Sequence, residues 1–347
     1  DAPSFSFGIG QIQDLACEER SFSLSSNEIE KINPNTKTAP VFRSKTDALI
    51  ISGIYERTPI LIHEALPTGN PWNLGFLRML DMANDSDLFR SSCDLKSLGA
   101  SRIGNNIWEG KSGRYLPLYE AKMVNFFDDR WGYYPEGATD DTRALPRPSI
   151  EQKEDSSYAI TPRLWVEEGE VESRLLSKGH KRGWLFVHRG LTNNTNERTF
   201  ITSIVPRYAC GHSLPVWVFP DSTSAIELAC LYANTTSLIV DFIARSKVGG
   251  TNMSLFYLKQ FPLIAPSGYG APERDFIASR VIRLVYTHRL MRQFAEEMGV
   301  EREPFLYNNP ERATLRAELD AMFARLYGLD KDRLSYVLDP RDVAGPS

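Results

Sequence analysis

The sequence predicts a mixed α/β protein with an irregular N-terminal region and a helical C-terminal region. Three runs rich in β-branched and aromatic residues predict strands at residues 184–188, 199–205 and 214–219. Apolar residues at helical spacing predict helices at 225–233 and 237–246, after these runs. Strands in the centre followed by a helix-rich second half indicate the fold class.

Residues that disfavour helices and strands divide the first part of the chain into short segments. Asn33-Pro34-Asn35, Pro67 and Asn70-Pro71 interrupt its apolar runs, which indicates long loops. Further along, the pattern changes to long amphipathic helices. We therefore expect three segments: an irregular α/β region at 1–110, a mixed segment of strands and helices at 111–270, and a helical region at 271–347.

The segment that begins at Ser237 carries the most informative pattern. Ser237 is a candidate N-cap, and the helix after it ends in Arg245 and Lys247, which complement the negative end of the helix dipole. Gly249-Gly250 then predicts a turn with positive φ. Met253–Leu258 is expected to form a strand.

This glycine turn allows two interpretations. In the simpler one, it is the end of a helix that leads into a strand. In the other, the preceding cations bind phosphates while Thr251 or Asn252 reaches a base edge.

Two long helices are expected in the C-terminal region. The first spans Arg274–Glu297 and ends near Gly299, and the second spans Glu311–Tyr327 and ends at Gly328. The second helix carries apolar residues at intervals of three and four positions, which is typical of a helix packed on one side.

Charge is distributed unevenly along the chain. The net charge of −4 is unusual for a nucleic-acid-binding protein, yet seven basic residues between Arg174 and Arg207 oppose one acid, Glu197, a local excess of six. Such segregation fits a polyanion-binding face, and a solvated surface gives the same counts. The acids gather elsewhere, and we expect them in an exposed connector: Asp128, Asp129, Glu136, Asp140, Asp141 and the acids within 151–172.

The cysteines and the hydropathy limit the class of protein. The four cysteines, Cys17, Cys93, Cys210 and Cys230, are widely spaced, which indicates neither a zinc ribbon nor a disulfide framework. We expect a cytoplasmic protein without a membrane span, because no apolar run approaches the roughly 20 residues that a bilayer requires. The chain begins Asp1-Ala2-Pro3, so we expect a fragment of a longer polypeptide.

No complete active site is recognisable. Asn70-Pro71-Trp72 lacks the second proline of the motif that grips a flipped adenine in amino methyltransferases. Glu120-Ala121-Lys122 supplies half of a metal-dependent nuclease motif, without a well-placed upstream acid. A structural salt bridge is the preferred interpretation of that pair, and no histidine spacing indicates a metal.

Several strings, in conserved order along most of the chain, resemble the C-terminal half of large adenine-specific DNA methyltransferases, of the type IIG restriction-modification, DISARM and BREX kinds. They are Asn33–Thr36, Pro40–Arg43, Leu116–Met123, Phe127–Arg130, Thr195–Thr199, Asp241–Asn252, Phe256–Pro262, Arg316–Asp320 and Leu326–Gly328. Two positions depart from the pattern, since that family often has Gly at position 121 and His at position 129.

The resemblance implies a target recognition domain, which reads DNA sequence while a neighbouring domain methylates adenine. It implies a bacterial phage-defence or restriction-modification context, with S-adenosyl-L-methionine bound by the parent enzyme and no cofactor or metal in this segment. The implied partners are double-stranded DNA, the N-terminal methyltransferase domain of the same polypeptide and other defence-system subunits. On this reading, 1–110 leads from the methyltransferase domain and 111–270 is the recognition domain.

The candidate DNA-facing residues follow from the charges and the glycine turn. They are Arg198, Thr199, Arg245, Lys247, Gly249, Gly250, Thr251 and Asn252, with Lys181, Arg182 and Arg189 as phosphate contacts. No catalytic residue is assigned. Two alternatives remain open at this stage: a metal-dependent nuclease around Glu120 and Lys122, and a protein-interaction scaffold of a defence complex.

Overall fold

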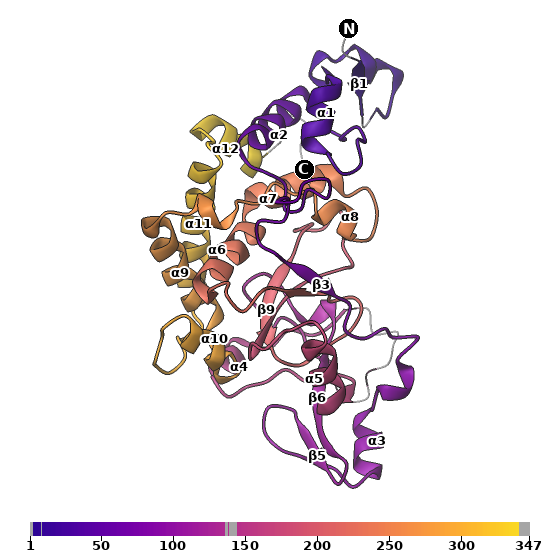
Figure 1. Ribbon diagram of the computed structural model, residues 1–347, viewed down its shortest axis with the longest axis vertical. Coiled ribbons are helices and arrows are strands. Elements are labelled where there is room, and N and C mark those ends of the chain that lie inside the picture. Colours follow the sequence, from indigo (N-terminus) through magenta and orange to yellow (C-terminus); the bar gives the residue numbers. More distant parts are fainter. Residues whose placement is uncertain (1–2, 8, 136–137, 139–143, 340–347) are drawn as a thin grey trace.

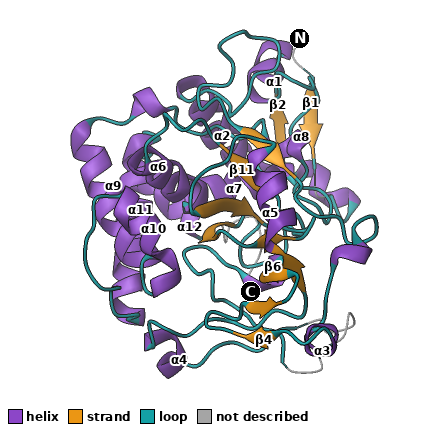
Figure 2. Ribbon diagram, turned by 60° about the horizontal axis from the view of Figure 1, so that its bottom comes forward, coloured by secondary structure: helices purple, strands orange, loops and turns teal. Residues whose placement is uncertain are grey.

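The computed structural model describes residues 3–7, 9–135, 138 and 144–339. Figure 1 shows an elongated molecule in which the N-terminal elements occupy one end and the segment around β5 and α3 the other. Most C-terminal helices lie along one side of the strands, as Figure 2 also shows. The predicted mixed α/β fold class is confirmed.

A four-stranded antiparallel sheet forms the centre of the molecule. Its order is β3 (Gly75–Leu77), β11 (Val216–Val218), β8 (Trp184–His188) and β9 (Thr202–Pro206). All five residues of β8 are buried, which explains why the strand is an almost continuous apolar run. The sequence predicted the bounds of β8 correctly.

The second sheet is built around β6 (Gly113–Tyr119), which pairs with three strands. The pairs with β5 (Trp108–Gly110) and β7 (Trp165–Glu167) are antiparallel, and the pair with β10 (Ala209–Cys210) is parallel. Strand β4 (Ser101–Arg102) extends the sheet beside β5. A separate N-terminal ribbon pairs β1 (Ser4–Ser6) with β2 (Ser21–Ser23).

Five α-helices lie in the described part of the first half of the chain, and serine caps four of them. They are α1 (Ser26–Ile32), α2 (Lys45–Arg57), α3 (Ser92–Ser97), α4 (Ile150–Glu154) and α5 (Glu168–Leu176). The serines at positions 25, 44, 91 and 149 accept backbone N–H groups at the starts of the first four. Single 3₁₀ turns occur at Ile12–Ala16, Glu18–Arg20, Ser86–Leu88, Ala121–Met123, Pro266–Gly268 and Arg289–Met291.

The helical layer surrounds α6, of whose twelve residues ten are buried. Its members are α6 (Ala225–Thr236), α7 (Leu238–Lys247), α8 (Leu255–Leu258), α9 (Ala271–Val285), α10 (Arg292–Glu297), α11 (Asn309–Leu326) and α12 (Lys331–Leu338). The largest buried cluster joins this layer to the central sheet and to the N-terminal helices, and it includes Phe42, Trp217 and Phe323. The three expected segments therefore share one core, and their boundaries stay a prediction.

No single helix in the described part of the chain has the length and apolarity to cross a bilayer. Helices α6 and α7 pass that test together, as a pair bent by 56°.

The long helix predicted at Arg274–Glu297 is wrong as one element, because α9 ends at Val285 and α10 begins at Arg292. The residues between them make tertiary hydrogen bonds instead. Tyr286 donates from its hydroxyl to the Arg302 carbonyl at 2.8 Å, and the His288 ring lies 2.9 Å from Asp129. Gly299 and Gly328 have φ of +77° and +70°, as a helix C-cap glycine predicts.

The strand predicted at Met253–Leu258 is also wrong. Residues Leu255–Leu258 form the one-turn helix α8, with Ser254 at its N-cap position. A short apolar run does not distinguish a strand from a helical turn, and here only Leu258 of that turn is buried.

Two acids of the expected exposed connector are buried. Asp128 contacts the ammonium of Lys153, and Asp129 faces His288, with all four side chains under a tenth exposed. Burial made this pairing necessary, because an isolated buried charge is strongly unfavourable. Glu136, Asp140 and Asp141 lie outside the described residues.

Candidate nucleic-acid interface

The glycine turn packs against the loop that follows β8. The Thr192 amide donates to the Thr251 carbonyl at 3.0 Å, and the Met253 amide donates to the Gly190 carbonyl at 2.8 Å. The four residues Gly249–Asn252 are exposed, as are residues 194–197 of the facing loop. Two loops far apart in sequence therefore form one surface, which we call the paired-loop surface (residues 193–197 and 249–252).

Neither glycine of the turn has the expected positive φ. Helix α7 ends at Val248, which is extended with φ −85° and ψ 100°. A Cβ atom added at Gly249 or Gly250 would contact nothing within 4 Å. The prediction of a left-handed turn is wrong, because the backbone leaves the helix directly in an extended conformation.

Asp241 connects α7 to the loop of the paired-loop surface. Its Oδ1 accepts the amides of Thr199 at 2.7 Å and Phe200 at 3.0 Å. Its Oδ2 accepts the Arg245 guanidinium at 3.1 Å, four residues along the same helix. Arg245 also donates to the carbonyls of Asn194, at 2.9 Å, and Glu197. Asp241 and Arg245 together hold the loop in place.

These contacts displace the start of β9. The predicted strand began at Thr199, but its amide and that of Phe200 are bound by Asp241, so pairing with β8 begins at Thr202. Thr199 is buried, and its hydroxyl has no hydrogen-bond partner within the described residues. Its position is therefore beneath the paired-loop surface.

Lys247 points inward from the end of α7. Its ammonium donates to the Ile32 carbonyl at 3.0 Å and to the side-chain oxygen of Asn33, and it lies 4.8 Å from the centre of the Tyr55 ring. Burial of the amino group lowers the pKa of Lys247 to about 7. The structure thus gives Lys247 a role in joining α7 to α1, and its phosphate contact stays a prediction.

Arg198 and Arg189 lie on the two sides of the loop. The Arg198 guanidinium stacks over Phe126 at 4.9 Å from the ring centre, and it is partly exposed beside the paired-loop surface. Arg189 donates to the Val124 carbonyl at 2.9 Å, and burial lowers its pKa to about 10. Arg189 therefore binds backbone in this structure.

Lys181 and Arg182 are not brought to the same place. They precede β8, while the paired-loop surface follows it, so the five-residue strand separates them at about 3.3 Å per residue. Lys181 is exposed and pairs with Asp221 at 2.9 Å. Arg182 pairs with Glu297, which also accepts the Trp184 indole N–H at 3.0 Å.

The local excess of positive charge is largely paired. Of the seven basic residues between 174 and 207, four form ion pairs: Arg174 with Asp85 and Glu170, Lys181 with Asp221, Arg182 with Glu297, and Arg207 with Glu172. Acids distant in the sequence reduce the net charge of this surface. A count of charges along the chain could not detect them.

Glu120 forms the structural salt bridge that the sequence favoured, but with another partner. Its carboxylate accepts the Arg163 guanidinium at 2.7 Å and 3.4 Å. Lys122, the other half of the nuclease motif, is exposed. Within the described residues, no group of three His, Cys, Asp or Glu side chains is placed to hold a metal ion.

Sequence reasoning missed Asp241 as the centre of this arrangement. The spacing of Asp241 and Arg245, four positions on one helix, was the available signal.

Comparison with known proteins gives no relative. No protein-family model matches the chain, and no curated protein matches it.

Proposed function

We propose that this chain is the DNA recognition module of an adenine-N6 DNA methyltransferase in a restriction-modification or phage-defence system. Sequence would be read by the paired-loop surface. S-adenosyl-L-methionine would be bound by a separate methyltransferase domain of the parent polypeptide, and this segment would supply no catalytic residue. The resemblance of the ordered sequence strings to that family supports the proposal.

The observation that carries the proposal is the chemistry of the paired-loop surface. Exposed Asn194, Thr195, Asn196, Thr251 and Asn252 present amides and hydroxyls, which donate to and accept from base edges. Asp241 and Arg245 fix the first loop from below, and backbone pairing fixes the second against it. Loops held by a rigid scaffold are typical positions for recognition residues.

The charges near the paired-loop surface favour DNA binding in which base contacts matter more than electrostatic attraction to phosphates. Most basic residues near the surface are engaged with carbonyl or carboxylate groups, and the net charge is −4. Phosphate neutralisation dominates the affinity of nucleic-acid-binding proteins. We therefore expect weak duplex binding by this chain, with the methyltransferase domain supplying further phosphate contacts.

The test is selection from a duplex library with a randomised centre, at low salt, followed by sequencing of the bound fraction. One sequence should be enriched. Asn252→Ala and Thr251→Ala should lose preference at one or two base pairs, with about 1 to 3 kcal/mol of discrimination lost at each. Asn84→Ala, which removes an exposed amide on another loop, is the matched control. No enrichment, or equal effects of Asn252→Ala and Asn84→Ala, would contradict the proposal.

A further inference from the structure

A pocket outside the paired-loop surface lies at the end of the molecule that carries α3 and β5. It lies beside α3 and the strands β4, β5 and β7, and its cavity volume is about 670 Å³. Small-molecule sites commonly have volumes of about 300 to 1,000 Å³. Figure 1 places α3 and β5 at the end of the molecule opposite the N-terminal helices.

The walls of this pocket are aromatic. Trp108 and Trp165 meet edge to face, with ring centres 6.1 Å apart, and Tyr133 and Tyr134 line the opposite side. Both indoles are almost completely buried. Flat apolar walls of this kind favour a planar ring as ligand, because stacked and edge-to-face contacts add to the burial of apolar area.

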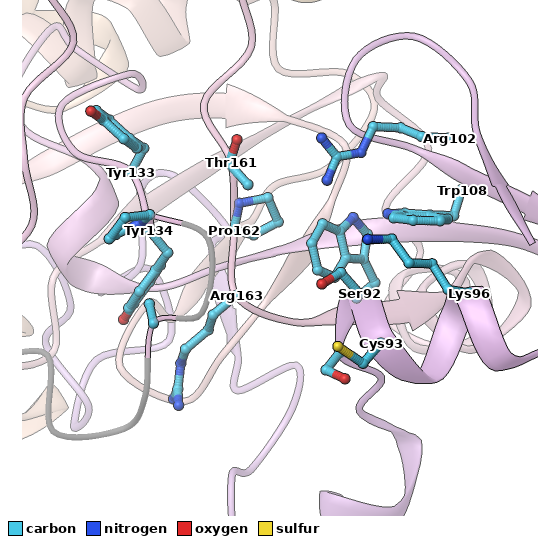
Figure 3. Close-up of a pocket in the computed structure, with 14 residues that line it drawn as sticks. Ser92, Cys93, Lys96, Arg102, Trp108, Tyr133, Tyr134, Thr161, Pro162 and Arg163 are labelled. Atoms are coloured by element: carbon cyan, nitrogen blue, oxygen red, sulfur yellow. The ribbon is translucent and has the colours of Figure 1, made fainter.

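Cations and donors supply the polar part of the pocket. Figure 3 shows the Arg102 guanidinium pointing into the pocket. Arg102 lies 5.3 Å from the Trp108 ring centre and 6.0 Å from that of Trp165. Arg163, which also lines the pocket, pairs with Glu120. No acidic residue is among the described residues that line the pocket.

The indole N–H of Trp108 gives an independent indication of a ligand. It is buried and has no acceptor within the described part of the chain, whereas the N–H of Trp165 donates to the Asn106 carbonyl at 2.6 Å. In Figure 3 the Trp108 nitrogen lies on the side of the ring that faces the pocket. A buried donor without a partner is unfavourable, so an acceptor supplied by a ligand would complete it.

We infer that this pocket binds a nucleotide, with the base against the aromatic wall, the phosphate at Arg102 and an acceptor atom at the Trp108 N–H. The guanidinium of Arg102 favours an anionic ligand over a metal cation, and the aromatic side chains favour a planar base over a sugar alone. The nucleotide is either a free mononucleotide or an unpaired nucleotide of a DNA strand. The inference does not depend on the proposed function of the paired-loop surface.

Two native cysteines allow nucleotide binding to be tested without any substitution. Cys93 lines the pocket and is exposed, while Cys17 is exposed and is not among the residues that line it. The rate of alkylation at each is measured by mass spectrometry with each of the four deoxynucleoside 5′-monophosphates, and with a single-stranded hexanucleotide. A bound nucleotide should slow alkylation of Cys93 at least fivefold and leave Cys17 unchanged.

Substitutions in the pocket test which side chains contact the nucleotide. Arg102→Ala should require at least tenfold more nucleotide for the same protection, and Trp108→Phe, which keeps a ring and removes the N–H, several-fold more. Lys111→Ala, which removes an exposed cation on the turn between β5 and β6, is the matched control and should behave as the parent protein. Trp108→Phe keeps the test decisive if Arg102→Ala fails to fold.

Protection by a mononucleotide identifies a free nucleotide as ligand, and protection by the hexanucleotide alone identifies a strand. The inference is overturned if neither slows alkylation of Cys93, if inorganic phosphate protects as well as a nucleotide, or if folded Arg102→Ala is protected like the parent protein.

Discussion

The carboxylate of Asp241 accepts the backbone N–H of Thr199 at 2.7 Å, across 42 positions of sequence. The same oxygen accepts the Phe200 amide, and the second oxygen binds Arg245. One buried side chain thus sets where β9 begins and how the loop at residues 193–197 is held. Its removal offers the most direct test of how the paired-loop surface is built.

We expect Asp241→Ala to lower the free energy of unfolding by about 3 kcal/mol, because it leaves two buried amides and a guanidinium without their acceptor. Asp241→Asn should lose less, since its amide oxygen still accepts the two backbone N–H groups. Urea denaturation measures both values. Equal losses for the two variants would show that the charge, and not the acceptor, is what matters.

The buried amino group of Lys247 should make the free energy of unfolding depend on pH. Its pKa is about 7 in the folded protein, against an ordinary value of 10.5. Between these values the unfolded chain binds the proton and the folded protein does not, so stability rises with pH across this range. The destabilising effect is complete below pH 7 and disappears as the pH approaches 10.5.

Lys247→Met keeps the aliphatic chain and removes this proton. From pH 6.5 to 9.5 the parent protein should gain about 3 kcal/mol of unfolding free energy relative to Lys247→Met. Urea denaturation at the two pH values measures the difference, with Lys45→Met, at an exposed lysine, as control. A constant difference between parent and Lys247→Met would show that the ammonium stays charged in the fold.

Lys181 and Arg182 are neighbours with different expected effects. Arg182→Ala should lower the free energy of unfolding by about 2 kcal/mol, because it leaves Glu297 without its cation and removes packing on the Trp184 indole. Lys181→Ala should leave stability unchanged, since its pair with Asp221 is exposed. Thermal unfolding compares the two variants. A larger loss for Lys181→Ala would contradict the assigned roles.

We expect both glycines of the turn, Gly249 and Gly250, to tolerate substitution by alanine. Gly249→Ala and Gly250→Ala should leave the protein as stable or raise its stability by up to about 1 kcal/mol, because φ is not positive and the added methyl contacts nothing. Gly299→Ala also has open space around it but a φ of +77°, and should cost about 1 kcal/mol. Denaturation midpoints of the three variants test the backbone argument separately from packing.

Local patterns predicted several elements well. β8 was predicted with its exact bounds, α11 within two residues, and Ser237 as the N-cap of α7, where its hydroxyl accepts the Val240 amide. Each depends on interactions within a few residues: apolar periodicity, a capping side chain, or a glycine after a helix. Such signals are present in the sequence whatever the rest of the fold does.

Other elements depended on partners that are distant in the sequence. The break between α9 and α10 follows from hydrogen bonds of Tyr286 and His288 to residues 302 and 129. The start of β9 follows from Asp241. In both places a tertiary contact outweighs the local preference of the chain, which differs between alternatives by roughly 1 kcal/mol per residue or less.

By itself, the sequence determined the fold class, the starts of α6, α7 and α11 to within two residues, and the presence of a polar, glycine-containing turn beside basic residues. Tertiary structure decided what the charges do. Arg189 and Lys247 bind backbone carbonyls, and Arg182 binds Glu297, because folding brings acceptors from remote segments to them. Charge acts through space, so whether a cation is available to a ligand depends on distances that linear spacing does not contain.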